Sequence, residues 1–94
     1  MSGRDPTGQL LRALARSAAV AGCTVALRRD SLTPWASVTF VGGVHRVLVT
    51  GAALEYWLAD LPTADLELCG HFVASCDVSA TTSGAMLTVL VLEA

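Results

Sequence analysis

The fold of this chain is decided by residues 34–50, which read PWASVTFVGGVHRVLVT. Two runs rich in β-branched and aromatic residues flank a Gly-Gly pair at residues 42–43. Such a pair can adopt the positive φ angles of a type I′ turn at little steric cost. The pattern therefore predicts a β-hairpin that turns at the glycines and in which Val41 faces Val44.

Side-chain alternation divides this predicted hairpin into two faces. One face is apolar except for its histidine, and its members are Ala36, Val38, Phe40, His45, Val47 and Val49. The opposite face is mixed, and its large apolar members are Trp35, Val41, Val44 and Leu48. If the helices pack on the first face, this second strip stays uncovered, which is typical of a surface that contacts a partner or a second copy. The alternative is that Trp35 folds over the edge of the sheet. Our leading expectation is a homodimer that forms through this strip.

Helical patterns lie on both sides of the hairpin. Asp5 and Pro6 form a helix-start signal, and a stripe of Leu and Ala follows over residues 9–21 until Gly22, a typical residue after a helix end. A second helix is predicted over residues 52–61, where the apolar stripe consists of Leu54, Trp57, Leu58 and Leu61.

Strand patterns fill most of the remaining chain. Besides the hairpin, β-rich runs cover residues 23–29, residues 66–79 with a bend at Gly70, and residues 85–93. Residues 30–34, Asp-Ser-Leu-Thr-Pro, are predicted to be the turn that joins the first strand to the hairpin.

The resulting order is α-β-β-β-α-β-β. It predicts one α+β domain over residues 1–94, with a mostly antiparallel five-stranded sheet, two helices on one face and a flexible tail at residues 1–4. The first five elements follow the order of double-stranded RNA-binding domains. Those domains hold phosphates with lysines at the start of the second helix, whereas residues 51–53 are Gly-Ala-Ala here. We therefore do not expect nucleic acid as a partner.

The charges are unevenly distributed along the chain. The net charge is −2, yet all six basic residues are arginines in the first half. Two interpretations stay open: the halves pair their charges across the surface, which we favour, or a basic face serves an acidic partner. That face would consist of Arg12, Arg16, Arg28, Arg29 and Arg46.

Cysteines and histidines suggest an alternative function. Cys69, His71 and Cys76, with His45 or Cys23 as a fourth member, combine the thiolate and imidazole groups that zinc prefers. No paired zinc knuckle accompanies them, and Cys76 has the opposite strand parity unless Gly70 resets it. A small-ligand or metal-binding protein, or an enzyme, is the second hypothesis. Because the chain has neither a nucleophile elbow nor a phosphate loop, we expect no catalytic residue and no cofactor.

The expected compartment is the cytoplasm. Three cysteines without dense spacing do not form a secreted disulfide framework, and no apolar run reaches the ~20 residues of a membrane span. Residues 20–23, Val-Ala-Gly-Cys, look like a lipoprotein cleavage box, but Arg12 and Arg16 interrupt the apolar stretch that a signal peptide needs. The leading hypothesis is a non-catalytic interaction or structural protein.

Overall fold

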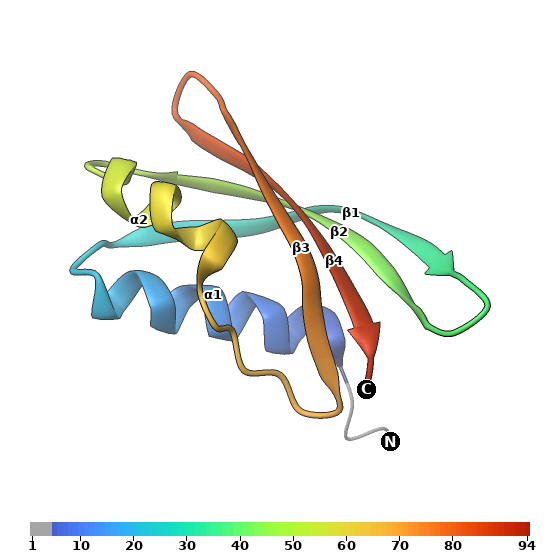
Figure 1. Ribbon diagram of the computed structural model, residues 1–94. Coiled ribbons are helices and arrows are strands. Elements are labelled where there is room, and N and C mark those ends of the chain that lie inside the picture. The colour runs from blue at the N-terminus through green and yellow to red at the C-terminus, as the bar shows by residue number, and fades with distance from the viewer. Residues whose placement is uncertain (1–4) are drawn as a thin grey trace.

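The computed structural model describes residues 5–94, so the predicted tail lies outside the described residues. The chain forms α1 (Pro6–Val20), β1 (Val25–Ala36), β2 (Val41–Gly51), α2 (Glu55–Asp60), a 3₁₀ turn η1 (Leu61–Thr63), β3 (His71–Ala80) and β4 (Gly84–Glu93). The strands form one antiparallel sheet in the order β1-β2-β4-β3 (Figure 1). The α+β class is confirmed, whereas the predicted five strands are wrong, because the described chain forms a four-stranded sheet.

The limits of α1 are set by the residues that the sequence indicated. The Asp5 carboxylate caps the helix by accepting a hydrogen bond from the Gly8 N–H at 3.2 Å. At the other end Gly22 has a φ of 81°, and the N–H of Cys23 donates to the Ala18 carbonyl at 2.8 Å. This is the Schellman arrangement, in which a left-handed glycine satisfies the last helical carbonyls.

The β1–β2 hairpin turns at a different place from the predicted one. The chain reverses at residues 37–40, because Ala36 pairs with Val41. The glycines at residues 42–43 therefore lie inside β2, and the predicted facing of Val41 and Val44 is wrong.

The two glycines allow close approach instead of a turn. A Cβ at Gly42 would collide with the Val91 carbonyl oxygen of β4, and a Cβ at Gly43 would lie 2.7 Å from Leu32 Cδ1. Glycine inside a strand often marks such a close contact with another backbone or side chain. The Gly-Gly pair thus marks a special position in the sequence, but the glycines are needed for contacts with the neighbouring strands and not for a turn.

Strand β1 unites two segments that the sequence separates. Residues 30–34, predicted to be a turn, lie within β1, and the register shifts between Arg29 and Ser31. The extra residue, Asp30, forms a bulge. Pro34 is tolerated because β1 is an edge strand, whose outer side needs no ladder hydrogen bonds. The fusion of these two segments explains why the sheet has four strands.

The second helix is shorter than predicted. The prediction was a helix over residues 52–61, whereas α2 covers the 6 residues Glu55–Asp60. It continues as η1, which contains Pro62. The predicted apolar stripe nonetheless faces the core. Leu54, Trp57 and Leu61 are buried, and Leu58 is half-buried.

The second hairpin, β3–β4, follows its prediction more closely. Gly70 has a φ of 75°, and β3 begins directly after it, at His71. A bulge between Val73 and Ser75 places Val73, and not Ala74, on the face that carries Cys76 and Val78. Strand β4 lies between β2 and β3 and carries apolar side chains on both faces.

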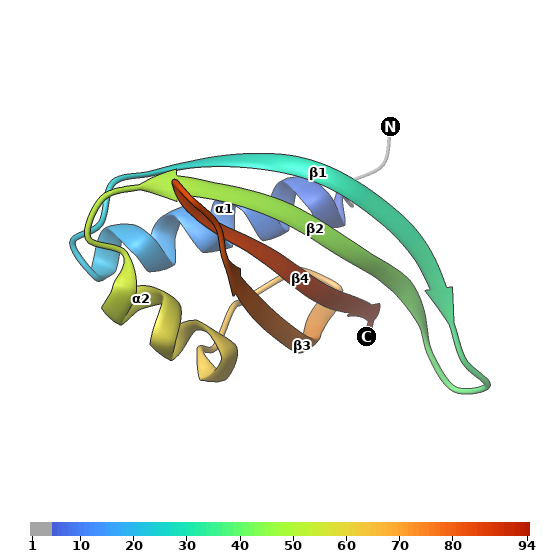
Figure 2. The same ribbon diagram turned by 90° about the horizontal axis from the view of Figure 1, so that it is seen from above.

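The core lies between one face of the sheet, here called the inner face, and both helices. Indole Nε1 of Trp57 in α2 donates to Ser17 Oγ in α1 at 2.9 Å, which ties the helices together. Figure 2 shows α1 behind β1 and β2, with the opposite, outer face toward the viewer. The large residues with the smallest exposure in this core are Leu10, Leu14, Leu61, Leu87, Val47, Val49, Val89 and Val91.

Candidate interaction surface and histidine pocket

The outer face of the sheet carries an apolar centre on its two middle strands. Val44 of β2 pairs with Leu90 of β4, and Leu48 pairs with Met86. We call these four residues the outer patch. All four are half-buried by their neighbours on the sheet, and no described segment packs over them. The sequence had placed Val44 and Leu48 on such a strip.

Of the other two predicted members of the strip, Trp35 lies on the same face and Val41 does not. Trp35 pairs with Gly42 at the end of the outer face, next to the hairpin turn. Val41 alternates with Gly43 and His45, so it belongs to the inner side of β2, and its assignment to the outer strip is wrong. The shifted turn is the cause of this error.

A charged row crosses the outer patch. Arg46 of β2 pairs with Thr88 of β4, and Thr88 pairs with Asp77 of β3, so the three side chains share one cross-strand row. Arg46 and Asp77 lie on either side of Thr88, with their backbones two strand spacings, about 10 Å, apart. The outer face thus carries a positive and a negative group on opposite sides of its middle.

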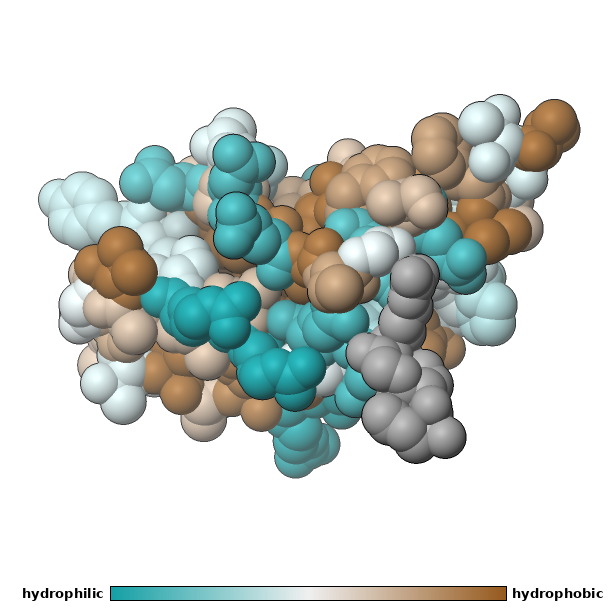
Figure 3. Space-filling model, turned by 90° about the horizontal axis from the view of Figure 1, so that it is seen from below, coloured by the Kyte–Doolittle hydropathy of each residue, from teal (hydrophilic) through white to brown (hydrophobic). Residues whose placement is uncertain are grey.

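The end of the β1–β2 hairpin is an apolar arm. Figure 1 and Figure 2 show it projecting beyond α1 and β3, and Figure 3 shows apolar side chains at this right-hand end. The rings of Phe40 and Phe72 make an edge-to-face contact with centroids 5.6 Å apart. Exposed large apolar residues at this end are Leu32, Trp35, Val38, Phe40, Val41 and Phe72.

A pocket joins the two histidines that the sequence singled out. It has a volume of about 180 Å³ and is lined by His45, His71 and Glu93, with Leu32 and Val91 among its apolar walls. It lies at the N-terminal end of α1, whose first residue, Pro6, also lines it.

His45 is the buried polar residue of this pocket. The side chain is 1% exposed, and its Nε2 lies 3.0 Å from Thr7 Oγ1 in the first turn of α1. Its Nδ1 has no hydrogen-bond partner among residues 5–94. Burial lowers the pKa of His45; the positive charges of Arg29 and His71 act in the same direction, and the Gly43 carbonyl opposes them. The imidazole is therefore neutral at neutral pH.

The two candidate cysteines do not join the histidines. Cys69 is exposed beside α1, where its N–H donates to the Gln9 side chain, and its carbonyl lies 3.2 Å from His71 Nδ1. Cys76 is buried on the inner face, where burial raises the pKa of its thiol. Within the described chain, no group of three or more His, Cys, Asp or Glu residues is placed to hold a metal ion. The four candidates therefore do not converge on one metal centre.

The five arginines of the predicted basic face are divided between two surfaces. Arg28 and Arg46 pair with Leu48 and Ser31, respectively, and so belong to the outer face. Arg29 projects from the other side of β1. Arg12 and Arg16 lie on the exposed side of α1. One continuous basic face is therefore not formed.

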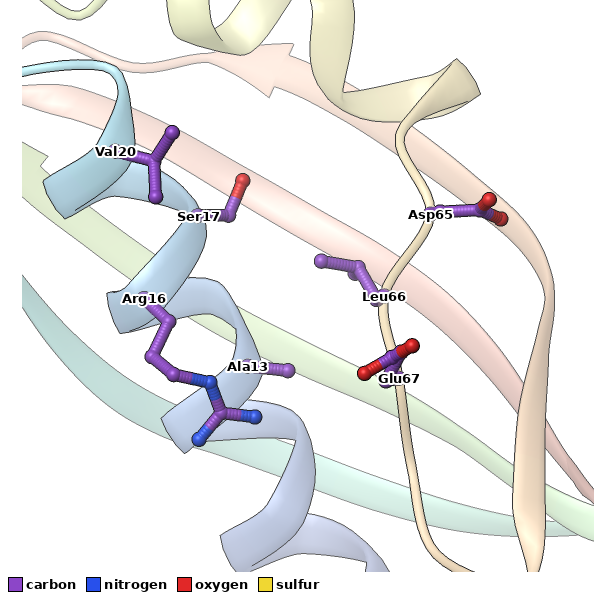
Figure 4. Close-up of a pocket in the computed structure, with 7 residues that line it drawn as sticks. All are labelled: Ala13, Arg16, Ser17, Val20, Asp65, Leu66 and Glu67. Carbon is purple, nitrogen blue, oxygen red and sulfur yellow. The ribbon is translucent and has the colours of Figure 1, made fainter.

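A groove runs beside α1. A pocket of about 420 Å³ in this groove separates Arg16 and Ser17 of the helix from Asp65 and Glu67 of the extended segment before β3 (Figure 4). Its two walls carry opposite charges. The groove supplies no buried unpartnered group that would point to a ligand.

Comparison with known protein families, with curated proteins and with solved structures finds no match for this chain. No helix of the described residues is long and apolar enough to cross a membrane. The function is therefore argued from the geometry of the two sites.

Two features of these sites could not be predicted from the sequence. The row formed by Arg46, Thr88 and Asp77 depends on the strand order, which local patterns do not give. The contact between Thr7 and His45 joins residues that are 38 positions apart, and no local signal indicates it.

Proposed function

We propose that this protein is a non-catalytic interaction protein that forms a two-fold homodimer through the outer face of its sheet. The observation that carries the proposal is the outer patch, four aliphatic side chains on the two middle strands that no described segment covers. Apolar side chains left uncovered on a sheet face are typical of association sites in small proteins. The three cysteines are unpaired, and we include a reducing, cytoplasmic location in the proposal.

The edges of the sheet favour association through a face. Strand β1 carries the Asp30 bulge and Pro34, and β3 carries a bulge at Ala74. Bulges and prolines on edge strands hinder the addition of a strand from another chain. A second copy is therefore expected to pack face to face, at the spacing of about 10 Å found between stacked sheets.

The charges of the outer face are complementary to a second copy of the same face. A two-fold axis that runs along β4, between the two sheets, exchanges the β2 side of one protomer with the β3 side of the other. It places Arg46 of one protomer opposite Asp77 of its partner, twice. On either side of this row Leu90 and Met86 face their own copies, and Val44 and Leu48 face the Ser75 and Ser79 positions of the second copy. A two-fold interface uses the same surface on both subunits, so this pairing satisfies both charges at once.

The direct test is the substitution Leu48→Asp. A carboxylate in the outer patch would be buried without a partner in the dimer, so we expect a folded monomer where the wild type is a dimer. Size-exclusion chromatography with light scattering measures the mass, and circular dichroism checks the fold. Val20→Asp is the matched control, because Val20 is 90% exposed on α1, away from the sheet face. An unchanged dimer of Leu48→Asp, or a monomeric wild type, overturns the proposal.

A further inference from the structure

The apolar arm gathers most of the exposed apolar side chains at one projecting end of the molecule. Among residues 5–94, all of the large apolar residues that are exposed belong to it except Val20 and Tyr56. Val38 is fully exposed in the turn between β1 and β2, and Figure 1 shows this turn extending beyond the rest of the sheet. A stable protein–protein interface uses roughly 20–30 residues a side, far more than this narrow end provides. The arm therefore favours a partner that can deform around it.

Charge is absent from the end of the arm and mostly positive behind it. Residues 31–44 contain no acidic, basic or histidine side chain. The charged residues of the β1–β2 hairpin lie behind this stretch, and all but the last are basic: Arg28, Arg29, Arg46 and Asp30. All of them are exposed. The hairpin is thus a positive part of a chain whose net charge is −2, which makes it complementary to an anionic surface.

The turn at the end of the arm satisfies its own polar backbone groups. The N–H of Ser37 donates to the Phe40 carbonyl at 2.7 Å. Ser37 Oγ in turn accepts from the N–H groups of Thr39 at 3.3 Å and of Phe40 at 3.1 Å. Backbone groups without such partners are costly where no water reaches them, and this requirement is strictest in lipid. The turn can therefore leave water without losing the partners of these donors.

Two side chains define how far the arm can enter an apolar medium. Trp35 lies directly behind the turn, opposite Gly42, and tryptophan is enriched at membrane interfaces because it combines an apolar ring with a polar N–H. Glu93 ends β4 beside the arm, next to Leu92, which also pairs with Gly42. Because a carboxylate stays in water, Glu93 limits entry to the part of the arm beyond it. That part is the turn, with Val38 at its exposed end.

We propose that the apolar arm is a peripheral membrane anchor, whose end inserts into the interface of an anionic lipid bilayer without spanning it. Interfacial segments enter about 5–10 Å, and their binding strengthens with the buried apolar area and with the attraction to anionic lipids. Arg46 follows Val41 in β2 at a distance of about 17 Å along the strand, so its charge stays within about a Debye length of the headgroups. Anionic lipids are characteristic of the cytoplasmic leaflet, which agrees with the proposed location.

Vesicles of phosphatidylcholine and phosphatidylserine in equal parts test this proposal. We expect the protein to sediment with these vesicles, and to bind more weakly to vesicles of pure phosphatidylcholine. Lipids with brominated acyl chains should quench the fluorescence of Trp35 and not that of Trp57, which is 4% exposed in the core. Trp35→Phe leaves Trp57 as the only tryptophan and should therefore abolish the quenching. Absence of sedimentation, equal binding to both vesicle types or persistent quenching in Trp35→Phe overturns the proposal.

A matched pair of substitutions checks that the arm makes the contact. Val38→Asp should weaken binding to the mixed vesicles by about ten-fold or more, which is the effect of leaving one valine side chain in water. Val20→Asp introduces the same charge at a residue that is 90% exposed on α1, and should bind as the wild type does. Equal binding by the two variants overturns the proposal. A lower mass of Val38→Asp in light scattering, with unchanged vesicle binding, assigns the arm to a contact between two copies instead.

The lipid contact is expected in a single chain as well, because the arm lies outside the outer patch. Leu48→Asp, the variant expected to be a monomer, should therefore still show quenching of Trp35 by brominated lipids. Association and lipid binding are thus measured separately, and either proposal can fail without the other.

Discussion

The two faces of the sheet are built from similar residues but differ in what covers them. Val47 of β2 is fully buried, whereas its neighbour Leu48, on the outer face, stays half-exposed. The inner face is covered by side chains of both helices, such as Leu14 and Trp57, whereas the outer face is covered only at its hairpin end, where Phe40 packs against Phe72. Apolar strand residues thus indicate that a face is buried, but leave open whether the chain itself or another molecule buries it.

The sharpest test of this difference compares two leucines of β4. Leu87→Ala removes a fully buried side chain from the inner face and is expected to lower the free energy of unfolding by about 2–5 kcal/mol. Leu90→Ala, on the outer face of the same strand, should lower it by clearly less in a monomer. Urea unfolding of both variants in the Leu48→Asp background measures the two losses without a contribution from association.

Equal losses would show that the outer face is as well packed as the inner face. In that case the outer patch would belong to the fold of one chain, and the distinction between the two faces would fail. A larger effect of Leu90→Ala in the dimeric background than in the monomeric one would, in contrast, locate the missing cover in the second copy.

The sequence correctly predicted those elements that are determined by residues close to one another in the chain. Asp5 and Gly22 delimit α1 because a helix cap acts within a few residues. Strand β4 and the inward stripe of α2 were likewise readable from their periodicity.

Non-local contacts account for the errors. The glycines at residues 42–43 have the composition of a turn, but their purpose is to admit β4 and Leu32, which are remote in sequence. Asp30 and Pro34 have the composition of a loop, but an edge strand tolerates both as a bulge and a missing donor. Moving the turn by a few residues changes which side chains share a face, and this misplaced Val41.

The features of the candidate sites likewise divide into those that follow from local patterns and those that depend on the strand order. Val44 and Leu48 could be assigned to the outer face because alternation after the glycines was correct. The meeting of His45 with His71 requires the order β2-β4-β3 and the start of β3 after Gly70, which no local pattern provides. The separation of Cys69 from Cys76 follows from the same geometry.

A charge-reversal pair sharpens the comparison on the outer face. Arg46→Asp places two carboxylates opposite each other in the proposed dimer, twice, and should weaken association on the order of ten-fold, since surface ion pairs contribute up to about 1 kcal/mol each. Asp77→Arg alone should act similarly. The double variant restores opposite charges, and sedimentation equilibrium should show it recovering most of the lost affinity.

A double variant that dimerises no better than the single variants would contradict the two-fold arrangement along β4. Arg28 serves as the control, because it lies on the outer face at the edge strand, outside the row that contains Asp77. Arg28→Asp should change the dimerisation constant less than Arg46→Asp does.

The smallest expected effect concerns the polar residue of the inner face. Burial lowers the pKa of His45 in the folded chain below its ordinary value of 6.5, so the unfolded chain binds more protons as the pH falls through that value. The free energy of unfolding should therefore decrease between pH 7.5 and pH 5.5, and the decrease should level off below the folded-state pKa. His45→Leu removes this contribution, so the variant should show a smaller dependence on pH, whatever its absolute stability. Urea unfolding across this range, again in the Leu48→Asp background, compares how the free energy of unfolding changes with pH in the chain with His45 and in the chain with His45→Leu. Identical changes would mean that the imidazole accepts a proton as readily in the folded chain as in the unfolded one.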